Sequence, residues 1–375
     1  MILAYFVPET GACKSRRELA TFASLAMVSH DWCTYVRPRL YSDISFVDGI
    51  SETQKRLCCV TLASSPHLAS LVRNLFIAGN EYEIGGLGIA DSLEFQCALP
   101  NMCNLAALHF RRIDITFDIL HSFALLENLD TLSLIGCTFS LTDRDQASTS
   151  FAFTLRSLTI HGTPSLGHDS LIAKLFASNR LQSLSIDSFS TKIGLQVLSQ
   201  SFPSRLEKMY AEPSREQGAL FAKILLHAPR LRELGFTHGL RSLPLDPADL
   251  VCLRGSLSGL SRWAGPSAVM EYFLGTGPHE VEHIVLDQMI ALDTEDSTES
   301  ETLRPRNLFT SPEVENIRIQ TIQELLSRSN CLRTLDIVLS SSHSIKDIIA
   351  RCQHGLTELR VKCIESPEHT VGCLK

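Results

Sequence analysis

The sequence predicts an α/β solenoid in which short parallel strands alternate with helices along most of the chain. Three observations predict it: one six-residue frame recurs, its copies keep a near-constant spacing, and helical patterns precede several copies. The frame is apolar-x-x-apolar-x-apolar, and residues 181–186 (LQSLSI) show it clearly. Because the fourth and sixth residues of an extended frame point the same way, each copy presents an apolar side of a strand.

The spacing of the copies indicates a repeat array. Most neighbouring copies are 24 to 26 residues apart, and self-similarity at a period in the twenties is typical of leucine-rich repeats. Clean copies begin at Leu105, Leu129, Leu155, Leu181, Leu231, Leu332 and Leu356, and weaker copies begin at Val72, Leu206, Leu257, Val281 and Val314.

Segments that precede several frames supply the second half of each repeat. Residues 171–176, 220–226 and 321–326 carry apolar side chains at helical spacing, each shortly before a frame. One repeat, a strand and a helix, cannot bury its apolar face alone, whereas stacked repeats bury a continuous core. We therefore predict a leucine-rich-repeat solenoid over residues 49–375, a horseshoe with parallel strands on the concave side and helices on the convex side.

Composition narrows the functional classes. The chain has 375 residues, 44% hydrophobic and 20% charged, with a net charge of −7 and a pI near 6.0, so no basic surplus indicates nucleic acid as a partner. No apolar run is long enough for a membrane helix, and residues 1–7 are too short for a signal peptide. Twelve cysteines without C-x-x-C spacing predict reduced, mostly buried thiols in an intracellular protein, cytoplasmic or nuclear.

Residues 1–48 do not follow the repeat. Ser15 and Glu18 have the spacing of a capping box, which predicts the start of a helix. Apolar side chains then recur every three or four residues, and Pro38 predicts that the helix ends before it. The recurring side chains are Leu19, Phe22, Leu25, Ala26, Val28 and Trp32. A helical cap on the end of the solenoid would explain this pattern.

Two short motifs in this region carry a family resemblance. Residues 25–32 (LAMVSHDW) match an apolar helix that ends in Val-Ser-x-x-Trp, and residues 37–44 (RPRLYSDI) match a Pro-x-Leu-Tyr segment. The stretch resembles the second half of an F-box, as in fungal F-box proteins with leucine-rich repeats. That family usually opens with Leu-Pro-x-Glu, which is missing here, and residues 1–6 resemble the tail of its first helix. We therefore expect an N-terminally truncated or degenerate F-box.

The resemblance implies a substrate-recognition subunit of an SCF-type ubiquitin ligase, which is not itself an enzyme and needs no cofactor or metal. It implies that the N-terminal helices bind the Skp adaptor, and through it the cullin ligase core, while the repeats bind a protein substrate. By resemblance, the adaptor-binding residues are Leu25, Val28, Trp32, Pro38, Leu40 and Tyr41. The alternative is a leucine-rich-repeat interaction scaffold without a ubiquitin-ligase link.

The exposed side of the strands is the predicted partner surface, since the third and fifth positions of each frame point away from the core. Small polar residues occupy the first half of this row, and larger side chains occupy the second half. Tyrosine, tryptophan and arginine are frequent anchors of interfaces. The predicted partner-binding residues are Lys208, Tyr210, Trp263, Arg318 and Arg360.

No motif in the sequence indicates catalysis: there is no G-x-S-x-G, H-E-x-x-H or P-loop pattern. His279 and His283 have the i, i+4 spacing of zinc ligands on a helix, but a strand is expected at His283, so we predict no metal site. Residues 287–304 form an acidic stretch with interspersed Ser and Thr, which predicts a mobile loop or a regulatory phosphosite.

Overall fold

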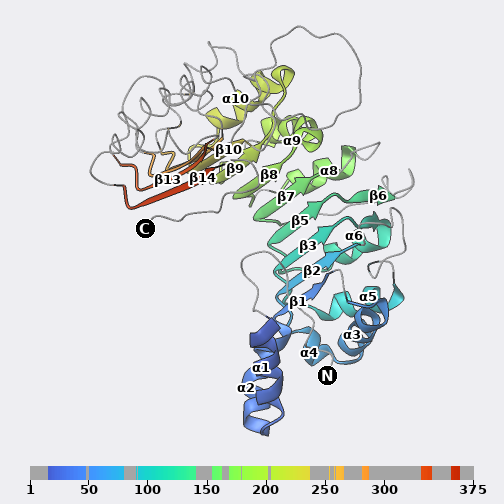
Figure 1. Ribbon diagram of the computed structural model, residues 1–375. Helices are drawn as coiled ribbons and strands as arrows, with labels where there is room; N and C mark the ends of the chain where they lie inside the picture. The colour runs from blue at the N-terminus through green and yellow to red at the C-terminus, as the bar shows by residue number, and fades with distance from the viewer. Residues whose placement is uncertain are drawn as a thin grey trace, which may run out of the picture. The chain divides into compact units, whose positions relative to one another are not determined.

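The computed structural model consists of two compact units, residues 1–197 and 198–375 (Figure 1). It describes residues 16–47, 50–79, 90, 92–140, 154–162, 169–178, 180–201, 204–236, 253, 257, 259–265, 281–286, 331–339 and 356–363. The predicted acidic stretch, the predicted helix at 321–326, the frame at Val314 and residue Arg318 all lie outside the described residues.

The first unit is built on a parallel sheet whose strands follow one another in chain order. The register aligns equivalent frame positions, for example Leu108 with Leu132 and then Leu158 with Leu184. The strands are β1 (Asp43–Phe46), β2 (Asn74–Ala78), β3 (Ala107–Arg111), β5 (Thr131–Ile135), β7 (Ser157–His161) and β8 (Ser183–Ile186). Five of these strands were predicted from the frames at 72, 105, 129, 155 and 181.

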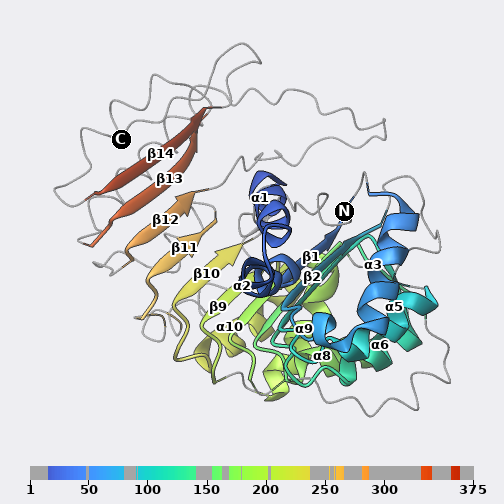
Figure 2. The ribbon, with the colours of Figure 1, turned by 90° about the horizontal axis from the view of Figure 1, so that it is seen from below.

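Helices cover one side of this sheet, as Figures 1 and 2 show. They bury the apolar side of the frames: the Phe110 and Phe123 rings, for instance, stack with their centroids 5.5 Å apart. The helices are α3 (Glu52–Ser64), α4 (Pro66–Ala69), α5 (Leu93–Ala98), η3 (Leu99–Asn101), α6 (Phe117–Ala124), α8 (Asp169–Phe176) and α9 (Ser188–Ser201), in which the chain passes into the second unit. The helix predicted at 171–176 is confirmed by α8.

A small second ladder lies beside the main sheet in the first unit. β4 (Asp114–Thr116) pairs in parallel with β6 (Thr138–Ser140). The carboxylate of Asp114 accepts hydrogen bonds from the hydroxyls of Thr138 and Ser140, which holds two successive repeats together.

Before β1, the chain forms two helices, α1 (Arg16–Ala26) and α2 (His30–Tyr41), which pack side by side as a hairpin. The prediction of one helix ending before Pro38 is wrong. Ser29 starts a new helix because its extended backbone lets the Ser29 hydroxyl cap the Trp32 N–H at 3.2 Å. Pro38 lies inside α2, where Ser42 N–H still donates to the Pro38 carbonyl at 3.0 Å.

The sheet begins earlier than the repeat pattern indicated. β1 pairs with β2 in the same register as later strands, so Ile44 and Phe46 occupy the two inward frame positions. Residues 43–46 lie within the segment that the sequence assigned to the N-terminal helical region. The first position of this frame falls on Tyr41, a half-buried residue at the end of α2, which hides the pattern.

The second unit carries another set of parallel strands in chain order. The strands are β9 (Lys208–Ala211), β10 (Glu233–Phe236), β11 (Arg262–Ala264), β12 (His283–Leu286), β13 (Thr334–Leu339) and β14 (Glu358–Cys363). Its described helices are η4 (Arg215–Gln217) and α10 (Gly218–Leu226), and α10 confirms the helix predicted at 220–226. β12 pairs directly with β13, so the frame at Val281 is followed in the sheet by the frame at Leu332.

One frame of the second unit was predicted out of phase. Leu234 pairs with Trp263, and Trp263 pairs with Ile284, so the inward position of this repeat is Trp263 and the frame begins at Leu260 rather than Leu257. Both leucines are buried, which explains why either fitted the first position of the frame.

The cysteines are divided between core and surface. Within the described part of the chain, Cys58, Cys59 and Cys137 are buried free thiols, and burial raises the pKa of Cys58 to about 12. Cys97, Cys103 and Cys331 are exposed, so the expectation of mostly buried thiols holds for only part of the described set.

Candidate functional site

An exposed apolar cluster lies on the helical hairpin. Met27 is 88% exposed, Val28 69%, Tyr35 56% and Trp32 44%. The Trp32 and Tyr35 rings meet edge to face with centroids 5.9 Å apart, and the Arg39 guanidinium lies 4.1 Å above the Tyr35 ring. We call Met27, Val28, Trp32 and Tyr35 the hairpin patch. Such a concentration of large apolar side chains is typical of a protein-interaction surface.

The second half of α2 anchors the helical hairpin to the sheet. Val36 is fully buried and Leu40 is 5% exposed, so both belong to the core next to β1. Trp32, Val36 and Leu40 are spaced i, i+4 and i+8, so they lie along one side of α2, and the cap at Ser29 sets the start of this helix. The burial of this side changes along the helix: Val36 and Leu40 are in the core, whereas Trp32, one turn before Val36, is exposed.

The predicted adaptor-binding residues therefore have different environments. Val28 and Trp32 are exposed within the hairpin patch, and Pro38 is exposed on α2. Leu25 and Tyr41 are half-buried, and burial raises the pKa of Tyr41. Leu40 requires a correction, because a core side chain cannot contact a partner directly.

Sequence reasoning missed Met27 and Tyr35. Val28, Trp32 and Tyr35 are spaced i, i+4, i+7, the spacing of one helical face, and this signal was available. The amphipathic pattern that we used to predict one helix includes Val28 and Trp32 but stops before Tyr35. The break at Ser29 instead leaves these side chains on the outside.

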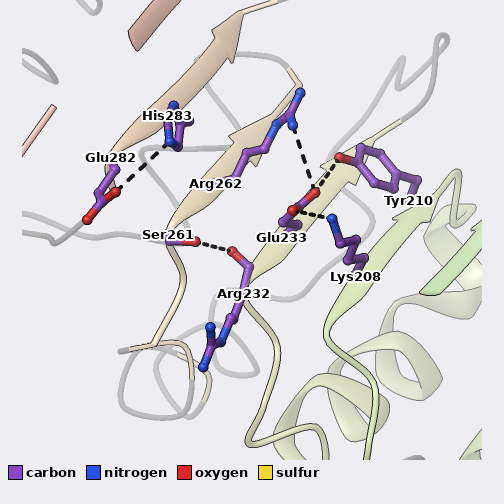
Figure 3. Close-up of polar contacts among 8 residues, drawn as sticks. All are labelled: Lys208, Tyr210, Arg232, Glu233, Ser261, Arg262, Glu282 and His283. Carbon is purple, nitrogen blue, oxygen red and sulfur yellow. Dashed lines mark hydrogen bonds and ion pairs between the residues drawn. The ribbon is translucent and has the colours of Figure 1, made fainter. Parts of the chain in front are cut away.

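A second candidate surface lies on the strands of the second unit, opposite the apolar side of the frames (Figure 3). The third frame positions of successive strands are in register: Lys208 with Glu233, Glu233 with Arg262, and Arg262 with His283. Their side chains form a polar row across four strands. Lys208 and Arg262 are about half exposed, whereas Glu233 is only 18% exposed.

Glu233 is the electrostatic centre of this row. Its carboxylate accepts a hydrogen bond from Lys208 Nζ at 2.6 Å and another from the Tyr210 hydroxyl at 3.2 Å, and Arg262 lies 4.0 Å away (Figure 3). Burial alone would raise the pKa of Glu233. The hydrogen bond and charge of Lys208, with smaller contributions from Tyr210 and Arg262, outweigh burial and hold this pKa below its ordinary value.

Tyr210 reaches Glu233 because the neighbouring strand carries a glycine. Tyr210 and Gly235 are register partners, and the Tyr210 ring lies where a Cβ at position 235 would be. The ring therefore lies flat across β10 instead of standing away from the sheet. Burial, as the largest cause, raises the pKa of the Tyr210 hydroxyl.

Trp263 was predicted on the partner surface, and this is wrong. It is 0% exposed and packs against Phe236, with ring centroids 5.3 Å apart. The physical reason is the phase of the frame: Trp263 occupies the inward position normally held by leucine. Its neighbours Arg262 and Ala264 are the outward residues of β11.

Arg360 is placed as predicted on an exposed strand position, with 64% of its side chain exposed. It is separated from Lys208 and Tyr210 in the order of the strands, and it pairs locally with Glu358 at 2.8 Å and with Asp336 at 3.8 Å. Of the predicted partner-binding set, the structure brings Lys208 and Tyr210 together around Glu233, a residue that the sequence did not single out.

The strand face of the first unit has a different chemistry. From β5 to β8 its third and fifth positions hold only serine and threonine, and the His161 ring is 2.7 Å from the Ser185 hydroxyl. His109 lies on the same face, and burial lowers its pKa. The larger charged side chains are thus found on the second unit, as the sequence predicted.

Membrane-spanning helices and metal clusters are both absent from the described residues. None of the helices that the structure describes is both long and apolar enough to span a bilayer. Among the same residues, no group of three or more His, Cys, Asp or Glu side chains is placed to hold a metal ion. His283 lies on β12, as expected, and His279 lies outside the described part.

Fold and surfaces define a leucine-rich-repeat solenoid preceded by a helical hairpin. No protein-family model matches the sequence, and no curated protein matches it. Among solved structures, the chain is similar to the crystal structure of the Rad7 and Elc1 complex in yeast, with 12% identity, a TM-score of 0.38, and coverage of 88% of this chain and 94% of that chain.

Proposed function

We propose that this protein is the substrate-recognition subunit of an SCF-type ubiquitin ligase. The helical hairpin binds the Skp adaptor, and the strand face of the repeats binds a protein substrate. The chain itself catalyses no reaction; it holds the target near the ligase, so that transfer becomes effectively intramolecular. The F-box resemblance of residues 25–44 suggests this role.

The observation that carries the proposal is the exposure of the hairpin patch. Four of the ten large apolar side chains exposed in the described residues fall between Met27 and Tyr35. Exposing such side chains to water is unfavourable by about 25 cal/mol per Å². A cap for the solenoid needs a buried apolar face and a polar outer face, which explains Val36 and Leu40 but not the hairpin patch.

The proposed adaptor contact uses Val28, Trp32 and Pro38, with Met27 and Tyr35 added from the structure. Leu40 contributes indirectly by anchoring α2 to the core. Arg39, above the Tyr35 ring, limits the motion of that ring and presents a cation at the edge of the patch.

Co-purification with the Skp adaptor tests the proposal. The full chain is expressed with the adaptor as wild type, as the double variant V28S/W32S, and as the control L93S/L125S. Leu93, on α5, is 71% exposed, and Leu125, directly after α6, is 56% exposed, so the control removes comparable apolar surface elsewhere in the first unit.

We expect the wild type and the control to retain the adaptor and V28S/W32S to lose it, with unchanged circular dichroism. A folded wild-type chain that binds no adaptor would overturn the ligase role. The alternative, an interaction scaffold without a ubiquitin-ligase link, would then be favoured. Equal retention by V28S/W32S would place the adaptor contact elsewhere.

A further inference from the structure

We propose that strands β9 to β13 of the second unit bind a short acidic-apolar segment of a partner protein. A partner carboxylate pairs with Arg262 and Lys208, an apolar side chain covers Ala264 and Val285, and a hydrogen-bond donor reaches Asp336. The inference deepens the proposed function, on which it rests, by giving the chemistry of the substrate segment.

The charge balance of the polar row favours an acidic partner. On β9 to β11, Lys208 and Arg262 are positive and Glu233 is negative, so this end of the surface has an excess of one positive charge, while the negative Asp336 lies at the other end, on β13. Lys208 forms the short contact with Glu233 at 2.6 Å, whereas Arg262 lies at 4.0 Å, the outer limit of an ion pair. The Arg262 guanidinium, 44% exposed, thus keeps donors for a second carboxylate.

An apolar strip runs beside this row. The fifth frame positions of β9 to β12 are Tyr210, Gly235, Ala264 and Val285, in register from strand to strand. Tyr210, Ala264 and Val285 are half-buried, and the Tyr210 ring covers Gly235. Because these side chains are short or lie flat, a partner side chain can approach the sheet closely between the charged positions.

The strip ends at Asp336, the next residue in register after Val285. One carboxylate oxygen of Asp336, Oδ1, is buried and has no hydrogen-bond partner among the described residues, while Oδ2 lies 3.8 Å from Arg360. The Asp336 side chain as a whole is 27% exposed, so an incoming N–H or O–H group can approach the carboxylate from its exposed side and form a hydrogen bond there.

The Arg262 end of the polar row, the apolar strip and Asp336 are close enough together for one short peptide segment to contact all of them. Arg262, His283 and Thr334 are in register on β11, β12 and β13, and two strand spacings amount to about 10 Å. About three residues of extended chain cover this distance. An acidic residue followed within three positions by an apolar residue and an amide side chain therefore fits the surface.

Fluorescence anisotropy with synthetic peptides on the full chain tests the inference. The labelled probe is Gly-Ser-Asp-Leu-Val-Gln-Ser-Gly, with a second peptide that carries Lys in place of Asp and a third that carries Ser-Ser in place of Leu-Val. Low ionic strength is used because exposed charge pairs are then least screened. The proteins are wild type, R262E, D336A and the control R156E, which reverses an exposed arginine of the first unit.

We expect wild type and R156E to prefer the Asp peptide over the Lys peptide by about fivefold, and R262E to reverse this preference. The Ser-Ser peptide should bind more weakly to each protein. D336A should weaken the Asp peptide because it removes the acceptor, even though it also removes a negative charge. Failure of R262E to change the preference, or equal binding of all three peptides to wild type, would overturn the inference.

The adaptor assay is run on the same preparations, so the two proposals can fail separately. Loss of the adaptor with a retained Asp preference would reject the ligase role alone. Retained adaptor binding without any Asp preference would reject the acidic-apolar segment alone.

Discussion

Tyr210 lies across Gly235, its register partner on the next strand, and thereby brings its hydroxyl to Glu233. Two residues that are 25 positions apart in the sequence thus fix one conformation of an aromatic ring on the strand face. The glycine is required by space, since a Cβ at position 235 would overlap the Tyr210 ring.

The substitution G235A should therefore destabilise the protein by about 1–3 kcal/mol, the usual cost of overpacking. Urea denaturation of G235A against wild type measures this free energy. In a Y210A background the ring is gone, so G235A should cost little, and equal costs in both backgrounds would contradict the contact.

W263A should be among the most destabilising single substitutions in the second unit. Trp263 is fully buried against Phe236, and removing a buried tryptophan costs about 3–5 kcal/mol. Denaturation followed by circular dichroism checks the value. R262A, which changes the exposed neighbour, serves as the control and should cost less than 1 kcal/mol.

The stabilising effect of Glu233 should depend on pH in a definite direction. Its pKa in the folded protein is lowered below the ordinary value of about 4.3. Such a group stabilises the folded state at pH above its unfolded pKa, and the stabilisation is lost as the pH falls through the folded pKa.

E233Q should consequently be less stable than wild type near pH 7, by about 0.5–1 kcal/mol for a partly exposed pair, and the difference should shrink below pH ~4. Thermal melts at both pH values measure it. A difference that grew on acidification would contradict the ion pair with Lys208.

Substitution of Pro38 by alanine should increase the stability of helix α2. A proline in a helix interior is about 3 kcal/mol less favourable than alanine, because it lacks the N–H and its ring crowds the preceding turn. P38A should therefore stabilise α2 by up to that amount, and hydrogen exchange of the α2 amides should slow. S29A should act the other way and cost about 1 kcal/mol through the lost cap.

The repeat could be predicted because the strand of each repeat follows the same six-residue frame. The frames at Leu105, Leu129, Leu155 and Leu181 coincide with β3, β5, β7 and β8, and their register follows from the fourth position. Strong periodicity, with leucine at the fourth position of each of these frames, leaves only one phase that buries the apolar side.

The sequence predictions that were wrong or incomplete also have local causes. Leu257 and Leu260 both fit the start of a frame, and only the pairing of Leu234 with Trp263 decides between them. The helical break at Ser29 was hidden because apolar spacing continues through Val28 and Trp32. Glu233 could not be found from sequence, since its importance depends on neighbours that are 23 and 25 residues earlier and meet only in the sheet.

The chain has two tryptophans, and the structure gives them opposite surroundings. Trp32 is 44% exposed on the helical hairpin, and Trp263 is fully buried in the second unit. Intrinsic fluorescence therefore has two distinguishable sources: a red-shifted, iodide-quenchable emission from the hairpin and a blue-shifted, protected emission from the repeats. Without any label, one spectrum can follow occupancy of the hairpin and the integrity of the second unit.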